Sequence, residues 1–207
     1  MDNLPSLAGQ SIARSELVLG GQKSGKSRRA EQLAQAWLAE SAHHRAVMLA
    51  TAKPWDDEMR SRIARHRADR AVRLPGMPTV EEPLQLAAAI TAHSSTETLV
   101  LVDCLTLWLT NQSVAFQTVD LGQNKEQNTA SEQEIRRRIA HLLIAIGQAP
   151  GPVVLVSNEI GLGVVPMGRE VRAFVDALGL LNQSVAAACA RVTLMAAGLP
   201  LILKDTP

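Results

Sequence analysis

The stretch Gly20-Gly21-Gln22-Lys23-Ser24-Gly25-Lys26-Ser27 constrains the fold of this chain most, because it satisfies the pattern G-x-x-x-x-G-K-[ST]. It follows a short apolar run and precedes residues with the apolar spacing of a helix. In a strand–loop–helix context the backbone N–H groups of such a loop turn toward a phosphate, the lysine reaches the β- and γ-oxygens, and the final hydroxyl can ligate Mg²⁺. We therefore predict a phosphate-binding loop (P-loop). The alternative is an ordinary Gly-rich turn.

Short apolar runs recur along the chain and are mostly separated by helical patterns. This alternation is typical of a doubly wound α/β fold with a mostly parallel sheet, covered by helices on both faces. We expect a P-loop NTPase, RecA-like architecture in a single domain over residues 15–207, preceded by a flexible N-terminal arm over residues 1–14. The predicted strands are Leu17–Leu19, Ala46–Ala50, Leu99–Val102, Val153–Val156, Val192–Met195 and, as a last possible one, Leu201–Leu203.

Composition argues against several other classes of protein. The 21 Lys and Arg residues nearly balance the 20 Asp and Glu residues, and aromatic residues are scarce, so we expect no nucleic-acid partner. No stretch of about eighteen apolar residues is present, so we expect no membrane span. Cys104 and Cys189 lie in apolar surroundings without metal-ligand spacing. Reduced core thiols are therefore expected, compatible with a cytoplasmic location.

Asp103 is the candidate carboxylate for Mg²⁺. It follows the apolar run Leu99–Val102, so it is expected at the carboxyl end of a buried strand, beside the P-loop. The alternative role is an N-cap for a helix that starts near Cys104. Both roles can hold at once.

A charged segment, Trp55 to Arg70, begins with acidic residues and ends with basic ones, as a helix dipole prefers. Its helical spacing places His66 one turn from Arg62 and one turn from Arg70. Neighbouring guanidinium groups keep an imidazole neutral, and hence nucleophilic, and can hold a triphosphate against it. From the residues alone, a solvated surface histidine remains the more common outcome.

Two further segments are distinctive. The run Val153–Val156 leads into Ser157-Asn158-Glu159 and a loop rich in Gly and Pro, so Asn158 and Glu159 are expected at the same sheet edge as the P-loop. The polar stretch over residues 111–132 is predicted to be a mobile excursion between helices. A solvated linker is favoured there over a substrate lid.

Taken together, these features closely resemble one family, the bifunctional adenosylcobinamide kinase / adenosylcobinamide-phosphate guanylyltransferases of cobalamin assembly. The resemblance runs from about Glu16 to Leu203. A P-loop alone is generic, but the ordered set of motifs is specific. That set comprises Gly20–Ser27, Ala50–Ala52, Asp56–Met59 with Arg62-Ile63 and His66-Arg67, Asp103-Cys104 with Thr110-Asn111, Ser157–Pro166 and Asn182-Gln183.

The resemblance implies that His66 is the catalytic nucleophile that becomes a GMP-histidine, with Lys26 catalytic in the kinase step. Arg65 stands where some members carry a second histidine, so His66 is the sole candidate. Ser27 and Asp103 are the implied Mg²⁺ ligands, although many relatives have Glu at position 103. The implied nucleotide-binding residues are Gly20, Gly21, Gln22, Lys23, Ser24, Gly25, Lys26, Ser27, Ala50, Thr51, Ala52, Arg67, Ala68, Asp69, Arg70, Glu81 and Asp103, with Glu82 as an alternative to Glu81.

Two reactions are expected from this resemblance. The enzyme phosphorylates adenosylcobinamide with ATP or GTP, then transfers GMP from GTP to adenosylcobinamide-phosphate. Mg²⁺ is the expected cofactor, and a homotrimer the expected assembly. The alternatives are a small-metabolite P-loop kinase without guanylyltransferase activity and a non-catalytic nucleotide-responsive switch.

Overall fold

The computed structural model describes residues 11–117 and 125–206; of these, residues 62, 66, 114–117 and 125–132 are described by their backbone alone. Its centre is a seven-stranded sheet with the order β3-β2-β4-β5-β1-β6-β7. Neighbouring strands from β3 to β6 are parallel, and β7 is antiparallel to β6. The strands are β1 (Ser15–Gly20), β2 (Arg45–Ala50), β3 (Thr79–Glu81), β4 (Thr98–Val102), β5 (Val153–Asn158), β6 (Arg191–Ala196) and β7 (Leu199–Asp205).

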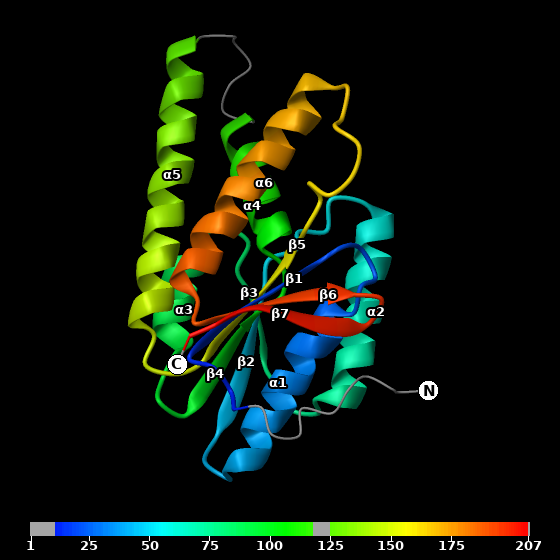
Figure 1. The fold of residues 1–207 in the computed structure, drawn as a ribbon, viewed down its shortest axis with the longest axis vertical. Helices are drawn as coiled ribbons and strands as arrows, with labels where there is room; N and C mark the ends of the chain where they lie inside the picture. Colours follow the sequence, from blue (N-terminus) through cyan, green and yellow to red (C-terminus); the bar gives the residue numbers. More distant parts are fainter. Residues whose placement is uncertain (1–10, 118–124, 207) are drawn as a thin grey trace.

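Helices cover both faces of this sheet (Figure 1). On one face, α3, α4, α5 and α6 bury apolar side chains such as Ile90, Trp108, Leu142 and Leu181 against the strands. On the other face, α1 packs through Leu33 and its neighbours. The helices are α1 (Lys26–Glu40), α2 (Asp57–Arg73), α3 (Leu86–His93), α4 (Leu105–Gln117), α5 (Lys125–Gln148) and α6 (Arg169–Ala188).

The expected fold class is confirmed, and each predicted apolar run lies within a strand. The sequence analysis missed β3, an edge strand of three residues whose side chains are all exposed or half-buried. Such a strand has neither the length nor the apolar character of the buried strands, so its sequence carries no period-2 signal. It is recognised only by its pairing with β2, in which Ala50 is the register partner of Glu81.

The interpretation of residues 111–132 as a polar excursion between helices is wrong for most of that stretch. Helix α4 continues to Gln117, and α5 begins at Lys125, seven residues before the predicted resumption at Glu132. Residues 118–124 lie outside the described part of the chain. Asn111 and Gln112 are buried, and their amide groups donate to backbone carbonyls, so they belong to the folded interior rather than to a solvated linker.

The boundary between an N-terminal arm and a single domain stays a prediction. Residues 1–10 lie outside the described residues, while the backbone carbonyl of Ser11 accepts a hydrogen bond from Arg191 at 2.9 Å. In the part of the chain that the structure describes, no helix is both long and apolar enough to cross a membrane.

Both thiols are free, Cys189 buried and Cys104 half-buried. Burial raises the pKa of Cys189 to about 12, and it also raises the pKa of Cys104. Both cysteines are therefore thiols rather than thiolates near neutral pH.

Candidate active site

The P-loop leaves the carboxyl end of β1 through backbone conformations that favour glycine. Gly20 has φ 152° and Gly25 has φ 102°, and a Cβ atom at Gly20 would lie 2.5 Å from the Met195 carbonyl oxygen. Lys23 also has a positive φ, 56°. The loop curls tightly enough for the Lys26 ammonium group to donate to the Gly21 carbonyl oxygen at 2.6 Å. This curled backbone is the geometry that cradles a phosphate.

The turn between β6 and β7 supports the P-loop from behind. The N–H of Gly198 donates to the Ser24 carbonyl oxygen at 3.0 Å. A Cβ atom at Gly25 would lie only 3.3 Å from Gly198 Cα, so the two backbones are in close contact. A hairpin distant in sequence thus holds the middle of the phosphate-binding motif.

Asp103 lies directly after β4, with β5 between it and the P-loop strand β1. Its Oδ1 accepts from the backbone N–H of Thr51 at 2.9 Å. The Thr51 hydroxyl lies 3.0 Å from the same oxygen and 2.7 Å from the Cys104 carbonyl oxygen. Since Thr51 follows β2, these contacts join the ends of two neighbouring strands and orient the carboxylate at the carboxyl edge of the sheet.

Helix α2 begins as predicted, with Asp56 Oδ1 accepting from the Met59 N–H at 2.7 Å. Near its other end, Arg70 is buried. Burial lowers the pKa of Arg70, and the nearby carboxylates of Asp103 and Glu31 act in the opposite direction. The guanidinium group remains charged at any physiological pH. The last turns of α2 therefore bring a cation into the electrostatic field of Asp103.

His66 lies in α2 one turn before Arg70. The side chains of His66 and Arg62 lie outside the described residues, so the predicted grouping of these two side chains with Arg70 stays a prediction. Ala68 and Asp69 are exposed on the same helix.

Arg67 and Glu81 form an ion pair between α2 and the end of β3. Both side chains are well exposed, which limits what the pair contributes to stability. Strand β3 is separated from β1 by β2, β4 and β5, so this pair is well removed from the P-loop along the sheet. The alternative residue, Glu82, instead accepts from the backbone N–H groups of Leu84 and Gln85 ahead of α3.

Asn158 and Glu159 lie beside the P-loop, as the sequence predicts. Gly20 is the register partner of Asn158, and the Glu159 N–H donates to the Gly20 carbonyl oxygen at 3.0 Å. Behind them, the buried Asn182 of α6 accepts from the Ser157 hydroxyl at 2.7 Å and donates to the Asn158 carbonyl oxygen at 3.0 Å. The family motif Asn182-Gln183 thus supplies a support for the strand end.

Sequence reasoning did not single out Thr106 as a site residue, and it named Asn111 only within the Thr110-Asn111 motif and as the start of the polar stretch. The Thr106 hydroxyl accepts from the Asn158 N–H at 3.0 Å, and the Asn111 amide donates to the Thr51 carbonyl oxygen at 2.7 Å. Helix α4 therefore ties the ends of β5 and β2 together. A polar residue that interrupts the apolar face of a predicted helix is the signal that could have found Asn111.

The donor set offered to a cation consists of a hydroxyl and a carboxylate. Ser27 lies in the first turn of α1, and Asp103 lies at the carboxyl edge of the sheet. Among the described residues, no group of three or more His, Cys, Asp or Glu side chains could hold a metal ion. These hard oxygen donors fit Mg²⁺, which takes one or two protein ligands and completes its coordination with phosphates and water.

The sequence matches the family described as cobinamide kinase / cobinamide phosphate guanyltransferase over residues 16–203. The chain belongs to this family. It is also similar to the bifunctional adenosylcobalamin biosynthesis protein CobP of Pseudomonas aeruginosa, with 45% identity over 93% of this chain and 98% of that protein. The proteins named CobU of Escherichia coli and Salmonella typhimurium are 38% and 35% identical, each over 91% of this chain and 98% of the relative.

These similarities confirm the expected function. The chain is a bifunctional cobinamide kinase and cobinamide-phosphate guanylyltransferase of cobalamin biosynthesis. The alternatives of a kinase without guanylyltransferase activity and of a non-catalytic switch are therefore set aside. The seven-stranded, mostly parallel sheet with a P-loop after β1 agrees with the P-loop NTPase fold.

Proposed function

We propose that both reactions take place at the carboxyl edge of the sheet, with Lys26 serving the kinase step and His66 the guanylyl transfer. The observation that carries this proposal is the placement of α2: its buried Arg70 lies in the electrostatic field of Asp103, and His66 precedes Arg70 by one helical turn. The helix that bears the expected nucleophile therefore approaches the residues expected to hold phosphate.

In the kinase step, the hydroxyl of the aminopropanol arm of adenosylcobinamide attacks the γ-phosphate of ATP or GTP. The bond between the γ-phosphorus and the bridging oxygen breaks, the nucleoside diphosphate leaves, and the hydroxyl proton is released. The P-loop N–H groups and the Lys26 ammonium stabilise the charge on the transferred group. For this role Lys26 exchanges its contact with the Gly21 carbonyl for phosphate oxygens.

Ser27 and Asp103 are the residues that would hold Mg²⁺. The bound ion supplies neutralisation of phosphate charge during transfer. The contribution of the chain is orientation, because Thr51 holds the Asp103 carboxylate through its backbone N–H and its hydroxyl.

In the transferase step, a ring nitrogen of His66 attacks the α-phosphate of GTP, and pyrophosphate leaves. A phosphate oxygen of adenosylcobinamide-phosphate then attacks the same phosphorus and breaks its bond to nitrogen, which restores the histidine. Covalent storage of GMP divides a difficult attack of phosphate on phosphate into two steps. Arg70 and the exposed Arg67 lie on the same helix and supply positive charge for the triphosphate. We assign Ala50–Ala52, Ala68, Asp69 and Glu81 to the surroundings of the nucleotide on the family resemblance.

Incubation with GTP labelled at the α-phosphate tests this division of roles. The wild-type protein is expected to acquire an acid-labile label, and His66→Ala is expected to lose the label while it still phosphorylates cobinamide. Lys26→Ala should lower the kinase rate by about a hundredfold or more. His93→Ala, an exposed histidine in α3, is the matched control and should behave as wild type. Loss of both activities in a folded His66→Ala protein would contradict the assignment.

We further propose that the enzyme is a cytoplasmic homotrimer. The family resemblance implies this assembly, and the edge strand β7 offers apolar side chains for a subunit contact, with Leu199, Leu201 and Leu203 all exposed. The free cysteines are compatible with a reducing compartment.

A further inference from the structure

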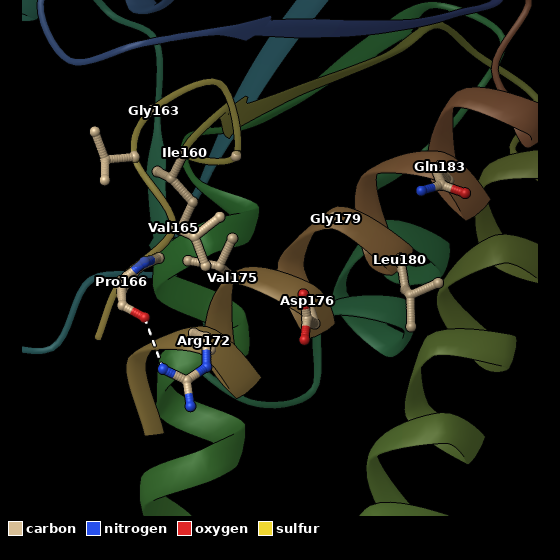
Figure 2. Close-up of a pocket in the computed structure, with 12 residues that line it drawn as sticks. Ile160, Gly163, Val165, Pro166, Arg172, Val175, Asp176, Gly179, Leu180 and Gln183 are labelled. Atoms are coloured by element: carbon tan, nitrogen blue, oxygen red, sulfur yellow. Dashed lines mark hydrogen bonds between the residues drawn. The ribbon is translucent and has the colours of Figure 1, made fainter. Parts of the chain in front are cut away.

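A hollow of about 540 Å³ lies between α6 and the loop that follows β5 (Figure 2). Ile160 and Val165 of the loop and Val175 and Leu180 of α6 give it apolar walls, and Arg172 and Asp176 add polar groups. Its size falls within the range of small-molecule sites, which combine apolar walls with a few polar groups. We call it the loop–α6 hollow. The roles proposed above do not use it.

The loop is fixed at both ends. At its start, the Glu159 N–H donates to the Gly20 carbonyl oxygen, which belongs to the P-loop motif. The Glu159 carboxylate also accepts from the Gly161 N–H at 2.7 Å, which folds the first residues back. At its end, the Arg172 guanidinium donates to the Pro166 carbonyl oxygen at 2.8 Å and to that of Met167 at 2.5 Å. One end of the loop therefore touches the phosphate site, and the other is fastened to α6.

The loop presents apolar side chains to solvent. Leu162 is 81% exposed, Val164 is 97% exposed and Met167 is 96% exposed. Contiguous exposed apolar side chains commonly mark a surface that another molecule covers. Because the loop is held at both ends, this surface keeps a fixed place next to the P-loop.

The chemistry of cobinamide matches this surface. A substrate that places its aminopropanol hydroxyl at the γ-phosphate must keep its broad corrin ring outside the phosphate cradle. The edge of that ring carries methyl groups, which suit the valine, isoleucine and leucine side chains, and carboxamide groups, which suit Arg172 and Asp176. We propose that the loop–α6 hollow receives one edge of the corrin ring in both reactions. This inference rests on the cobinamide kinase and guanylyltransferase function.

A nucleotide is a poor occupant of the same hollow. The Asp176 carboxylate, which lines the hollow, repels phosphate. A second copy of this chain is the other possible occupant, and the test below separates it from the corrinoid.

Gly179 provides a direct probe of the hollow. It lies in α6 and lines the hollow (Figure 2). A Cβ atom built there would have no heavy atom within 4 Å. A side chain at this position therefore starts in open space, and Gly179→Phe is designed to occupy the hollow. Gly179→Ala makes the same helix-favouring change while leaving the space open. Gly147→Phe is the matched control, because Gly147 is an exposed helical glycine in α5 with equally open surroundings.

The measurements are steady-state phosphorylation of cobinamide, equilibrium binding of cobinamide followed by its visible absorption, and labelling by α-labelled GTP. For Gly179→Phe we expect KM and Kd for cobinamide to rise about tenfold or more, with GTP labelling unchanged within twofold. Gly179→Ala and Gly147→Phe should match wild type. Wild-type turnover of cobinamide tests the function separately from the location of its site.

Three outcomes would overturn the proposal. The first is an unchanged Kd for cobinamide in a folded Gly179→Phe protein. The second is an equal loss of GTP labelling, which would make the hollow part of the nucleotide site. The third is a change in molar mass by light scattering with cobinamide affinity intact, which would make a second copy of the chain the occupant.

Discussion

At the residue scale, the contact between Thr51 and Asp103 decides how the candidate metal ligand is presented. A carboxylate at a strand end is free to rotate unless hydrogen bonds fix it. Here the Thr51 N–H and the Thr51 hydroxyl both donate to Asp103 Oδ1. The amide of Asn111 in turn holds the Thr51 carbonyl oxygen. The orientation of Asp103 therefore depends on residues from two other elements.

Replacing Thr51 by valine tests this orientation. Thr51→Val preserves side-chain shape and the backbone N–H but removes the hydroxyl, so one contact to Asp103 and one to the Cys104 carbonyl are lost. We expect kcat for the kinase to fall about tenfold, which corresponds to one hydrogen bond to a charged group, and the Mg²⁺ concentration needed for half-maximal rate to rise. The Mg²⁺ dependence of the rate is the deciding measurement, because general destabilisation would leave it unchanged.

Thr91→Val is the matched control for that substitution. Thr91 is exposed in α3, and its hydroxyl bonds the Ala87 carbonyl of its own helix. Its Mg²⁺ dependence should equal that of wild type. An equal shift in the Mg²⁺ dependence of both variants would contradict the role assigned to Thr51 in orienting Asp103.

The position of a candidate site residue in the fold was predictable where a local sequence pattern determines it. Gly20–Ser27 and Asp103 follow apolar runs, so their place at a sheet edge could be inferred from strand ends alone. Thr106 could not be found in this way. Its contact with the Asn158 N–H joins residues 52 positions apart, and nothing in the local pattern of either segment records that contact.

At the element scale, the β6–β7 hairpin acts as a support for the P-loop. Its turn contains Ala197 and Gly198, both with positive φ, and the Gly198 N–H donates to the Ser24 carbonyl oxygen. Glu16, the second residue of β1, is buried. Its carboxylate oxygens lie 3.6 Å from a guanidinium nitrogen of Arg29 in α1 and 3.7 Å from one of Arg191 in β6. Charged side chains thus join the hairpin, the P-loop strand and the P-loop helix.

Gly198→Ala measures what this support contributes to nucleotide binding. Gly198 has φ 82°, so an alanine there strains the backbone by about 1 kcal/mol and shifts the N–H that bonds Ser24. We expect the Kd for GTP to rise severalfold, measured by titration with a fluorescent GTP analogue.

Gly76→Ala is the control for backbone strain. Gly76 has nearly the same φ, 84°, and open surroundings, but it follows α2 in a loop and forms no part of the hairpin. The melting temperature should fall by a similar amount in the two variants, while only Gly198→Ala should bind GTP more weakly. Equal effects on affinity would show that the turn does not position the P-loop.

Elements were predictable in proportion to their burial. The strands β1, β4 and β5 are nearly continuous apolar runs buried on both faces, and each was expected from the sequence. Strand β3 and the last part of α4 were not. In α4, Asn111 and Gln112 are polar but buried, and their hydrogen-bond partners are distant in sequence. Their polar composition therefore wrongly indicated a solvated linker.

At the scale of the whole molecule, the order of the strands sets which residues meet. Strand β5 inserts between β1 and β4, which places the Asn158-Glu159 end between the P-loop and Asp103. Alternating strands and helices indicated a parallel sheet, but this order is fixed by long-range packing and was not readable from the sequence. The same order leaves β7 at one edge of the sheet, with no strand of the described residues beyond it.

An uncovered apolar edge strand usually pairs with or packs against something. In β7, Leu199, Leu201 and Leu203 are each more than half exposed, at 59%, 57% and 55%.

If β7 forms the subunit contact of the proposed homotrimer, Leu203→Glu should place a charge in an apolar interface and shift the protein to monomer. Size-exclusion chromatography with light scattering at micromolar protein concentrations measures the mass directly. Ile144→Glu, at an equally exposed isoleucine of α5, is the control and should keep the wild-type mass. A trimeric Leu203→Glu protein would assign the contact to another surface, and a monomeric wild type would refute the trimer itself.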